Sequence, residues 1–162
     1  MYYRYTIASL SELLAVVRDN RRGFAHWAEH ARSDRLRAIL HDRAQKNARV
    51  AAELAELIRQ LGGDPEMSRG TSGPARRGWV DFHPAVHANA QEALLEACER
   101  GEDRALEVYR NTLDEHLPEL VRQVVLRQFE DMMSDRNEIR VLSTDARRTG
   151  IVAVSIGGNA RQ

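Results

Sequence analysis

The sequence predicts an all-α fold, a four-helix bundle with a long crossover between the second and third helices and a short non-helical C-terminal tail. Three observations predict this fold. Apolar residues recur at spacings of three and four positions over four segments, which is typical of helices that bury one face. These segments are similar in length, and stretches rich in glycine or proline interrupt the chain between the second and third of them. A chain of 162 residues also has the usual size of one domain.

The first two helices are expected to form an antiparallel hairpin. The first is expected from Ser9 to Ala31, with Ser9 or Ser11 as its N-cap. The second is expected after a break at Arg32-Ser33-Asp34, with an apolar stripe from Leu36 to Leu61, and should end at Gly62, because glycine favours the C-terminal end of a helix. So short a connection between two helices favours antiparallel neighbours.

The third helix is expected over residues 85–113 and the fourth from Pro118 to Leu142. Residues 62–84 contain many glycines and prolines and are therefore expected to form a long connection. Such a connection lets the third helix run parallel to the second, which is the connectivity of a ferritin-like bundle. An up-down bundle with a decorated loop is the alternative. The bundle should occupy residues 8–142.

The last twenty residues differ in character from the predicted bundle. Residues 151–156 are mostly β-branched and are flanked by Gly150 and Gly157. Residues 143–162 are therefore predicted to form a non-helical tail. This tail is either loosely held or a strand that pairs with a neighbouring copy of the chain, since one strand alone forms no stable sheet.

The charge and cysteine content restrict the partners and the location of the protein. The 24 basic and 24 acidic side chains give no net charge, which argues against nucleic-acid binding and removes repulsion between copies. We therefore predict a homo-oligomer. The single cysteine, Cys98, excludes an internal disulfide, and no apolar run is long enough to cross a membrane. The start of the sequence also lacks the apolar stretch of a signal peptide, so we predict a cytoplasmic protein without a membrane partner.

Polar residues interrupt the apolar stripes near the middle of every helix. This buried polar layer is predicted to hold Arg21 from the first helix, Arg43 and Asn47 from the second, Glu99 or Glu102 from the third, and Gln128, Asp131, Asp135 or Arg136 from the fourth. Buried charges must be paired or bind a metal. Arginines on three helices would repel a divalent cation, and the Glu-x-x-His motif of di-iron bundles does not occur in the chain. We therefore expect no cofactor, and expect Arg21, Arg43 and Arg136 to pair with Glu99, Glu102 and Asp131.

Three phrases of the sequence carry a family resemblance that covers most of residues 9–142. They are Leu61-Gly62-Gly63-Asp64-Pro65, Arg77-Gly78-Trp79-Val80-Asp81, and Cys98-Glu99-Arg100-Gly101-Glu102-Asp103 with Tyr109. With them the chain resembles bacterial ferritin-like four-helix-bundle proteins that are grouped as a domain of unknown function. The resemblance implies a ferritin-like fold without an established activity, and suggests a stress-related role.

The chain departs from the family pattern at two positions. Relatives tend to carry an acidic residue before the Gly-Phe of the first helix and a histidine near the end of the fourth. This chain has Arg21 or Arg22 before Gly23-Phe24, and Arg136 at the second position. The resemblance therefore gives little support to a metal site in this member.

Three other groups of residues are candidate sites. His26, Glu29 and His30 match the H-x-x-E-H pattern of some zinc hydrolases, although the pattern lacks a third ligand here. His83 and His87 share a helical spacing, with Asp81 nearby as an oxygen ligand. Cys98 lies on an apolar face and is expected to be a core residue, with a reactive thiol as the alternative.

The sequence is compatible with two functions. The first is a non-catalytic bundle that acts through self-association or other protein contacts, without catalytic or metal-binding residues. The alternative is a ferritin-like oxidase or iron-handling protein that binds two iron or manganese ions. Its candidate ligands are Glu96, Glu99, Glu102 and Asp131.

Overall fold

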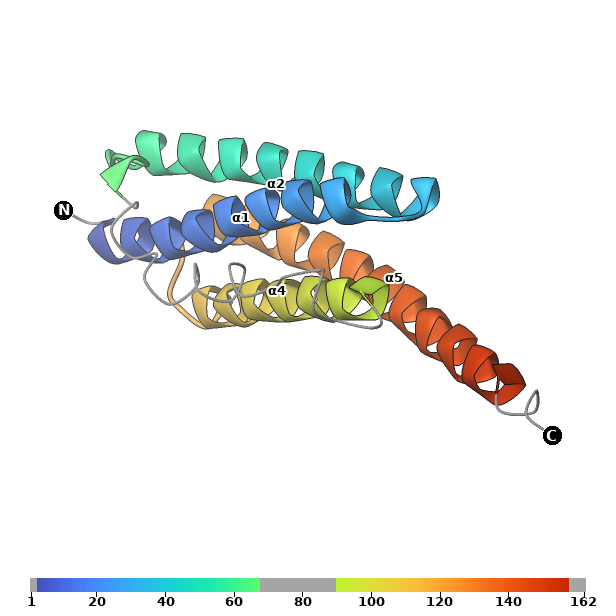
Figure 1. Cartoon of the computed structure of the whole chain (residues 1–162). Coiled ribbons are helices and arrows are strands. Elements are labelled where there is room, and N and C mark those ends of the chain that lie inside the picture. Colours follow the sequence, from blue (N-terminus) through green and yellow to red (C-terminus); the bar gives the residue numbers. More distant parts are fainter. Residues whose placement is uncertain (1–2, 68–89, 158–162) are drawn as a thin grey trace.

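The protein is helical throughout most of the part of the chain that the structure describes, residues 3–67 and 90–157. The computed structural model contains four long helices there, α1 (Arg4–His30), α2 (Asp34–Gln60), α4 (Ala90–Leu113) and α5 (Glu119–Gly157) (Figure 1). No strand occurs in these two ranges, which confirms the predicted all-α class. None of the four helices has an apolar stretch of the length that a membrane crossing requires.

The starts of the first two helices depend on different signals. Ser33 caps α2, because its hydroxyl oxygen accepts a hydrogen bond of 3.0 Å from the backbone N–H of Leu36. The predicted start of α1 was wrong, since this helix begins at Arg4. Ser9 and Ser11 lie inside it, and their hydroxyls donate to backbone carbonyls one turn earlier. Serine in a helix interior makes this local hydrogen bond instead of a cap.

The C-terminus of α2 has the two hydrogen bonds of a Schellman motif. The backbone N–H of Gly62 donates to the carbonyl of Arg59 at 2.9 Å, and that of Gly63 donates to the carbonyl of Ile58 at 2.8 Å. Gly62 has a φ of +87°, which side chains with a Cβ rarely adopt. A Cβ on Gly63 would lie 2.8 Å from Cγ2 of both Ile58 and Ile7. Both glycines are therefore required where the sequence predicted the end of the helix.

We expect Gly62→Ala to lower the free energy of unfolding by about 1 kcal/mol, because alanine must adopt the left-handed backbone conformation there. Gln60→Ala, at an exposed position of the last helical turn, is the control and should change stability by less than about 0.5 kcal/mol. Urea unfolding of both variants measures the difference. Equal stabilities would contradict a strained position 62.

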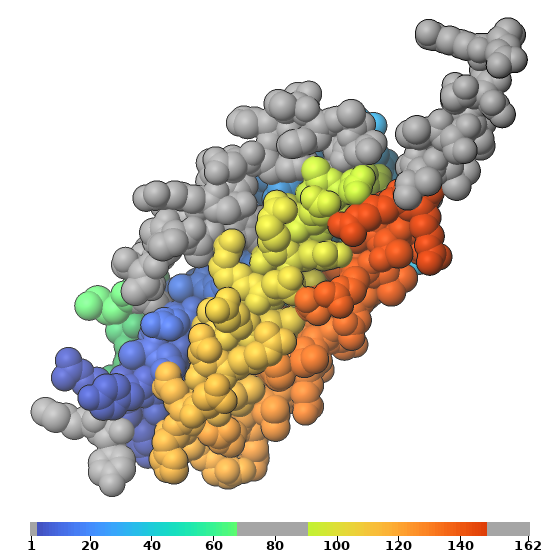
Figure 2. All heavy atoms as spheres, turned by 90° about the horizontal axis from the view of Figure 1, so that it is seen from below, coloured from blue at the N-terminus to red at the C-terminus, as the bar shows by residue number. Residues whose placement is uncertain are grey.

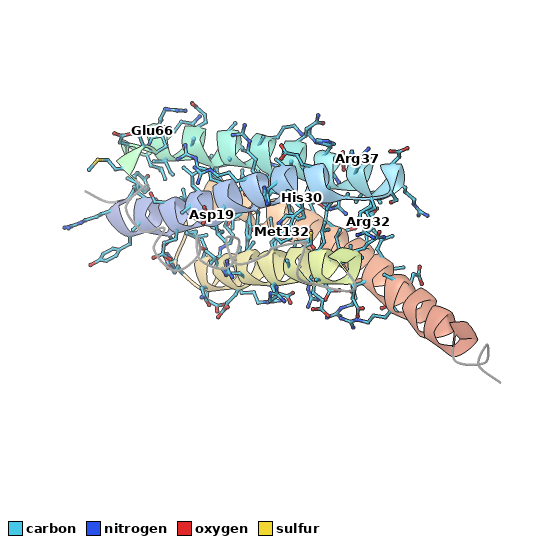
Figure 3. The ribbon with its side chains drawn as sticks, viewed as in Figure 1. Asp19, His30, Arg32, Arg37, Glu66 and Met132 are labelled. Atoms are coloured by element: carbon cyan, nitrogen blue, oxygen red, sulfur yellow. The ribbon has the colours of Figure 1, made fainter. Side chains whose placement is uncertain are left out.

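The packing of the helices fixes their directions. α1 packs against both α2 and α4, and α4 packs along α5 (Figure 2). Ser9 donates to Glu115 and Asn20 donates to the carbonyl of Gly101, so α1 and α4 run antiparallel. α2 and α4 run in the same direction, and α2 ends at the end of the bundle opposite to the start of α4 (Figure 1). Figure 3 shows Arg37 and Glu66 at these two opposite ends of the α2 region.

The apolar core consists of two clusters along the bundle. The first contains the early part of α1, the late part of α2, the late part of α4 and the early part of α5; its largest members include Leu10, Leu13, Leu54, Leu106 and Tyr109. The second contains the opposite ends of the same helices, including Phe24, Trp27, Leu40, Leu95, Cys98 and Ile139. Residues near the middle of each helix separate the clusters, and there the polar layer is found.

The predicted non-helical tail is wrong over residues 143–157, because α5 continues as a helix to Gly157. Neither glycine nor proline occurs between Pro118 and Gly150, and β-branched residues disfavour a helix by only a few tenths of a kcal/mol each. Ser143 is buried, and Arg147 makes ion pairs of 3.2 Å with Glu92 and Glu96 of α4. The predicted strand that would pair with a neighbouring copy is therefore also wrong in this range. α5 projects past the other helices (Figure 1).

Candidate functional site

The most unusual side chain in the bundle is Arg43, which is only 2% exposed. It belongs to the apolar stripe of α2, where Leu40, Ala44 and Ala51 are also buried. The three-and-four spacing of this stripe continues through Arg43 and Asn47, so helix geometry directs both side chains into the bundle. A charged group at such a depth requires partners.

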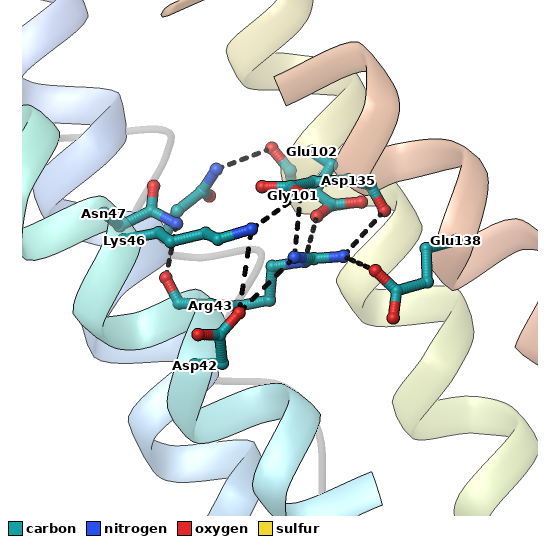
Figure 4. Close-up of polar contacts among 9 residues, drawn as sticks. Asp42, Arg43, Lys46, Asn47, Gly101, Glu102, Asp135 and Glu138 are labelled. Atoms are coloured by element: carbon teal, nitrogen blue, oxygen red, sulfur yellow. Dashed lines mark hydrogen bonds and ion pairs between the residues drawn. The ribbon is translucent and has the colours of Figure 1, made fainter. Parts of the chain in front are cut away.

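Two carboxylates of α5 provide these partners (Figure 4). One terminal nitrogen of the Arg43 guanidinium lies 2.8 Å from Oδ1 of Asp135. The other lies 2.6 Å from Oε2 of Glu138 and donates to the backbone carbonyl of Asp135 at 3.2 Å. Arg43 therefore links α2 to α5 through charge-assisted hydrogen bonds, which are stronger than neutral ones.

The outer side of this cluster contacts solvent. The Lys46 ammonium lies 3.1 Å from Oδ1 of Asp135 and 3.7 Å from Oδ2 of Asp42. The side chains of Glu138 and Lys46 are 54% and 41% exposed, so water screens their charges. The cluster therefore extends from the protein surface at Glu138 to the interior at Arg43.

Glu102 of α4 forms the inner side of the cluster and is 2% exposed. Its Oε1 lies 3.8 Å from Nε of Arg43, which is too far for a hydrogen bond. Burial raises the pKa of Glu102 to about 8, and the attraction of Arg43 offsets this only partly. Arg43 lies closer to the carboxylates of Asp135 and Glu138 than to that of Glu102. Neutral pH therefore favours the protonated, uncharged form of Glu102.

Several polar atoms of this layer have no hydrogen-bond partner among the described residues. They are Nε of Arg43, Oδ1 of Asn47 and Oε2 of Glu102. The amide nitrogen of Asn47 does donate to the carbonyl of Arg43, at 2.9 Å. A protonated Glu102 carries an O–H donor, and Oδ1 of Asn47 in the same layer is an acceptor without a donor. The layer therefore combines one cation, paired through both of its terminal nitrogens, with buried polar groups that are only partly hydrogen-bonded.

A second buried contact lies next to this layer. The Tyr109 hydroxyl donates to Oε1 of Gln128 at 3.0 Å, and the Gln128 amide donates to Glu53 at 3.0 Å. Burial raises the pKa of Tyr109 well above its ordinary value. These contacts join α4, α5 and α2, and provide a partner for each buried polar atom involved.

The structure places the predicted layer residues in three groups. Arg43, Asn47 and Glu102 are buried, Glu96, Glu99 and Arg136 are partly exposed, and Arg21 and Asp131 are exposed. Of the alternatives on the fourth helix, Gln128 is buried and Asp135 is mostly buried. The expected pairing of Arg21 with a buried carboxylate is wrong, and Arg136 pairs with the exposed Asp103 instead.

A choice between neighbouring positions explains why Arg21 and Asp131 are exposed. Val17 and Phe24 are seven positions apart, so either Asn20 or Arg21 can continue the stripe, and Asn20 is the residue that is buried. Burying an amide costs less than burying a guanidinium. On α5, Gln128 and Asp135 share the buried side at a spacing of seven, and Asp131 lies outside it.

Sequence reasoning missed Asn20, Lys46 and Glu138. The signal for Asn20 was its spacing of three from Val17 and four from Phe24. No comparable signal existed for Glu138, because it is half exposed and reaches Arg43 only with the tip of a long side chain. The partner of a buried arginine can therefore lie outside the buried stripe.

The histidine pattern on α1 lies on the surface. The rings of His26 and His30 are 4.6 Å apart, and Nδ1 of His30 lies 2.9 Å from the backbone carbonyl of His26. Both side chains and Glu29 are exposed. Within the described ranges, no three His, Cys, Asp or Glu side chains lie close enough together to hold a metal ion. His83, His87 and Asp81 lie outside the described residues.

Cys98 is a free, fully buried cysteine of the second apolar cluster. Burial raises the pKa of its thiol well above the ordinary value, and the nearby Glu102 adds to this increase. The reactive form of cysteine is the thiolate. Cys98 therefore fits the predicted core role and has little thiolate at neutral pH.

A family model described as "Domain of unknown function (DUF2383)" matches residues 5–115, which is more than half of the chain. The chain belongs to this family. In this DUF2383 protein the match covers α1 and α2 and extends past the end of α4. α5, with Asp135 and Glu138, lies outside the matched range. No curated protein shows a significant match to the chain.

Proposed function

We propose that this DUF2383 protein is a non-catalytic helical bundle that acts through protein contacts, and first through association with copies of itself. One observation carries this proposal. The side chains of Leu126, Met133 and Val141 on α5 are 43%, 40% and 60% exposed. Large apolar side chains gathered on one surface are typical of sites that contact another protein.

The polar layer supports a structural role for the bundle interior. Arg43 occupies the space between carboxylates that a bound cation would occupy in a metal site, and its guanidinium pairs with two of them. A guanidinium in this space cannot coordinate a substrate or a water molecule as a metal ion would. The layer is therefore better suited to joining α2 and α5 than to chemistry.

Other features agree with self-association in the cell interior. The chain has no net charge at neutral pH, so copies do not repel one another over long distances. Cys98 is free, as is usual in a reducing compartment, and we propose a cytoplasmic location. The parallel directions of α2 and α4 support a ferritin-like topology. The stress-related role suggested by the family resemblance stays a prediction.

Light scattering coupled to size exclusion tests the proposal. We expect the mean mass of the untagged protein to rise with concentration toward that of two or more chains, because apolar surface is removed from water on association. A mass of one chain at every concentration up to the millimolar range would contradict the proposal.

A second function, metal-dependent oxidation or iron handling, is favoured by one observation. Oε2 of Glu102 and Oδ1 of Asn47 are buried oxygens without a donor among the described residues. Arg43 beside them opposes a divalent cation, and the exposed Asp131 cannot join Glu96, Glu99 and Glu102 in one buried ligand set. Elemental analysis of untagged protein separates the two functions. Iron or manganese at one to two ions per chain would support the second function and contradict the first.

A further inference from the structure

We infer that two copies of the chain associate through the outer face of α5, with their α5 helices antiparallel and with Asn137 of both copies at the two-fold axis. This inference rests on the proposed function, because it specifies how the self-association occurs. The surface involved, which we name the α5 stripe, consists of Leu126, Glu130, Met133, Asn137, Arg140, Val141, Thr144 and Arg148.

The stripe is one continuous face of the helix. Leu126, Met133 and Val141 follow one another at spacings of seven and eight positions, which is close to two turns of an α-helix. All eight side chains are exposed, and the buried face of α5 lies on the other side, at Val125, Met132 and Ile139. The stripe therefore faces away from the bundle to which its helix belongs.

The charges of the stripe determine the direction of pairing. Glu130 lies toward its N-terminal end, and Arg140 and Arg148 lie toward its C-terminal end. None of the three forms an ion pair with another residue in the described ranges. A parallel pair would place Glu130 beside Glu130 and Arg148 beside Arg148, which is unfavourable. An antiparallel pair brings each Glu130 toward the arginines of the other copy.

The register follows from the apolar and charged residues together. With Asn137 at the axis, Met133 of one copy lies opposite Val141 of the other. Glu130 then lies opposite Thr144, between Arg140 and Arg148, which are each one turn from Thr144. Moving the axis to Met133 would instead place Glu130 opposite Arg136, about one turn from Arg140 but about three turns from Arg148. Two asparagines at the axis can hydrogen-bond to each other, as a central asparagine does in some coiled coils.

Reversing the charges tests the contact between Glu130 and the arginines. Sedimentation velocity should show a self-association Kd that is about tenfold or more higher for Glu130→Arg, and similarly for Arg140→Glu with Arg148→Glu. The variant carrying all three changes should recover most of the affinity. Asp131→Arg is the matched control, because it changes the same charge one position away on an exposed side outside the stripe. Equal effects of Glu130→Arg and Asp131→Arg would overturn the inference.

Single cysteines test the direction and register. Under mild oxidation Asn137→Cys should form a disulfide between copies, whereas Thr144→Cys should not, because two such residues would lie about 20 Å apart. Cys98 is buried and is kept in both variants. Cross-linking at both positions would indicate a parallel pair, and cross-linking at neither would exclude this face in a protein that still associates. A monomeric wild-type protein would contradict the proposed function itself.

Discussion

Arg43→Ala should lower the free energy of unfolding by roughly 3–5 kcal/mol, the largest single effect that we expect in the bundle. Arg43 is buried and holds the carboxylates of Asp135 and Glu138 at 2.8 and 2.6 Å. Without it, Asp135 keeps only the partly exposed Lys46 as a cationic partner, and Glu138 keeps none among the described residues. The loss of a large buried side chain adds a packing cost.

Two further variants separate charge from volume in this result. Arg43→Met keeps most of the side-chain volume, so the stability that it still loses reports the missing charge. Arg21→Ala removes an exposed arginine and should change stability by less than about 0.5 kcal/mol. Urea unfolding at pH 7 measures all three variants. A loss below about 1 kcal/mol for Arg43→Ala would show that the layer does not depend on its guanidinium.

Glu102→Gln should become more stable relative to the wild type as the pH rises from 5 to above 8, by roughly 2–4 kcal/mol in total. Burial raises the pKa of Glu102 from 4.5 to about 8. Between pH 4.5 and about 8, Glu102 keeps its proton in the folded protein but has lost it in the unfolded chain. Rising pH therefore destabilises the wild type, and glutamine lacks the group that ionises.

Urea unfolding of the wild type and of Glu102→Gln at several values between pH 5 and 9 measures this difference. Glu107→Gln, which removes an exposed carboxylate from the same helix, is the control and should stay within about 0.5 kcal/mol of the wild type. A constant difference between Glu102→Gln and the wild type over the whole range would mean that Glu102 is ionised throughout.

Much of the fold could be predicted because its signals are local. The spacing of apolar residues identified four helices, and Gly62 with its positive φ marked the end of α2. The extension of α5 could not be predicted in this way. β-branched residues after Gly150 favour a strand, and only the contacts of Arg147 with α4 show that the helix continues past Leu142.

The polar layer could be predicted only in part. A stripe that continues from Leu40 to Ala51 must bury Arg43 and Asn47, so these two residues followed from helix geometry. Asn20 and Arg21 lie within one position of each other, and periodicity alone cannot choose between them. Glu138 is a partner that only the arrangement of α2 beside α5 brings near Arg43.

We propose that this bundle associates with copies of itself and that a guanidinium, not a metal ion, holds the carboxylates of Asp135 and Glu138 in its polar layer. Native mass spectrometry of untagged protein tests both parts in one measurement. We predict a species with the mass of two or more chains and no additional mass from bound metal. A single chain at high concentration, or chains that each carry iron or manganese, would contradict the account.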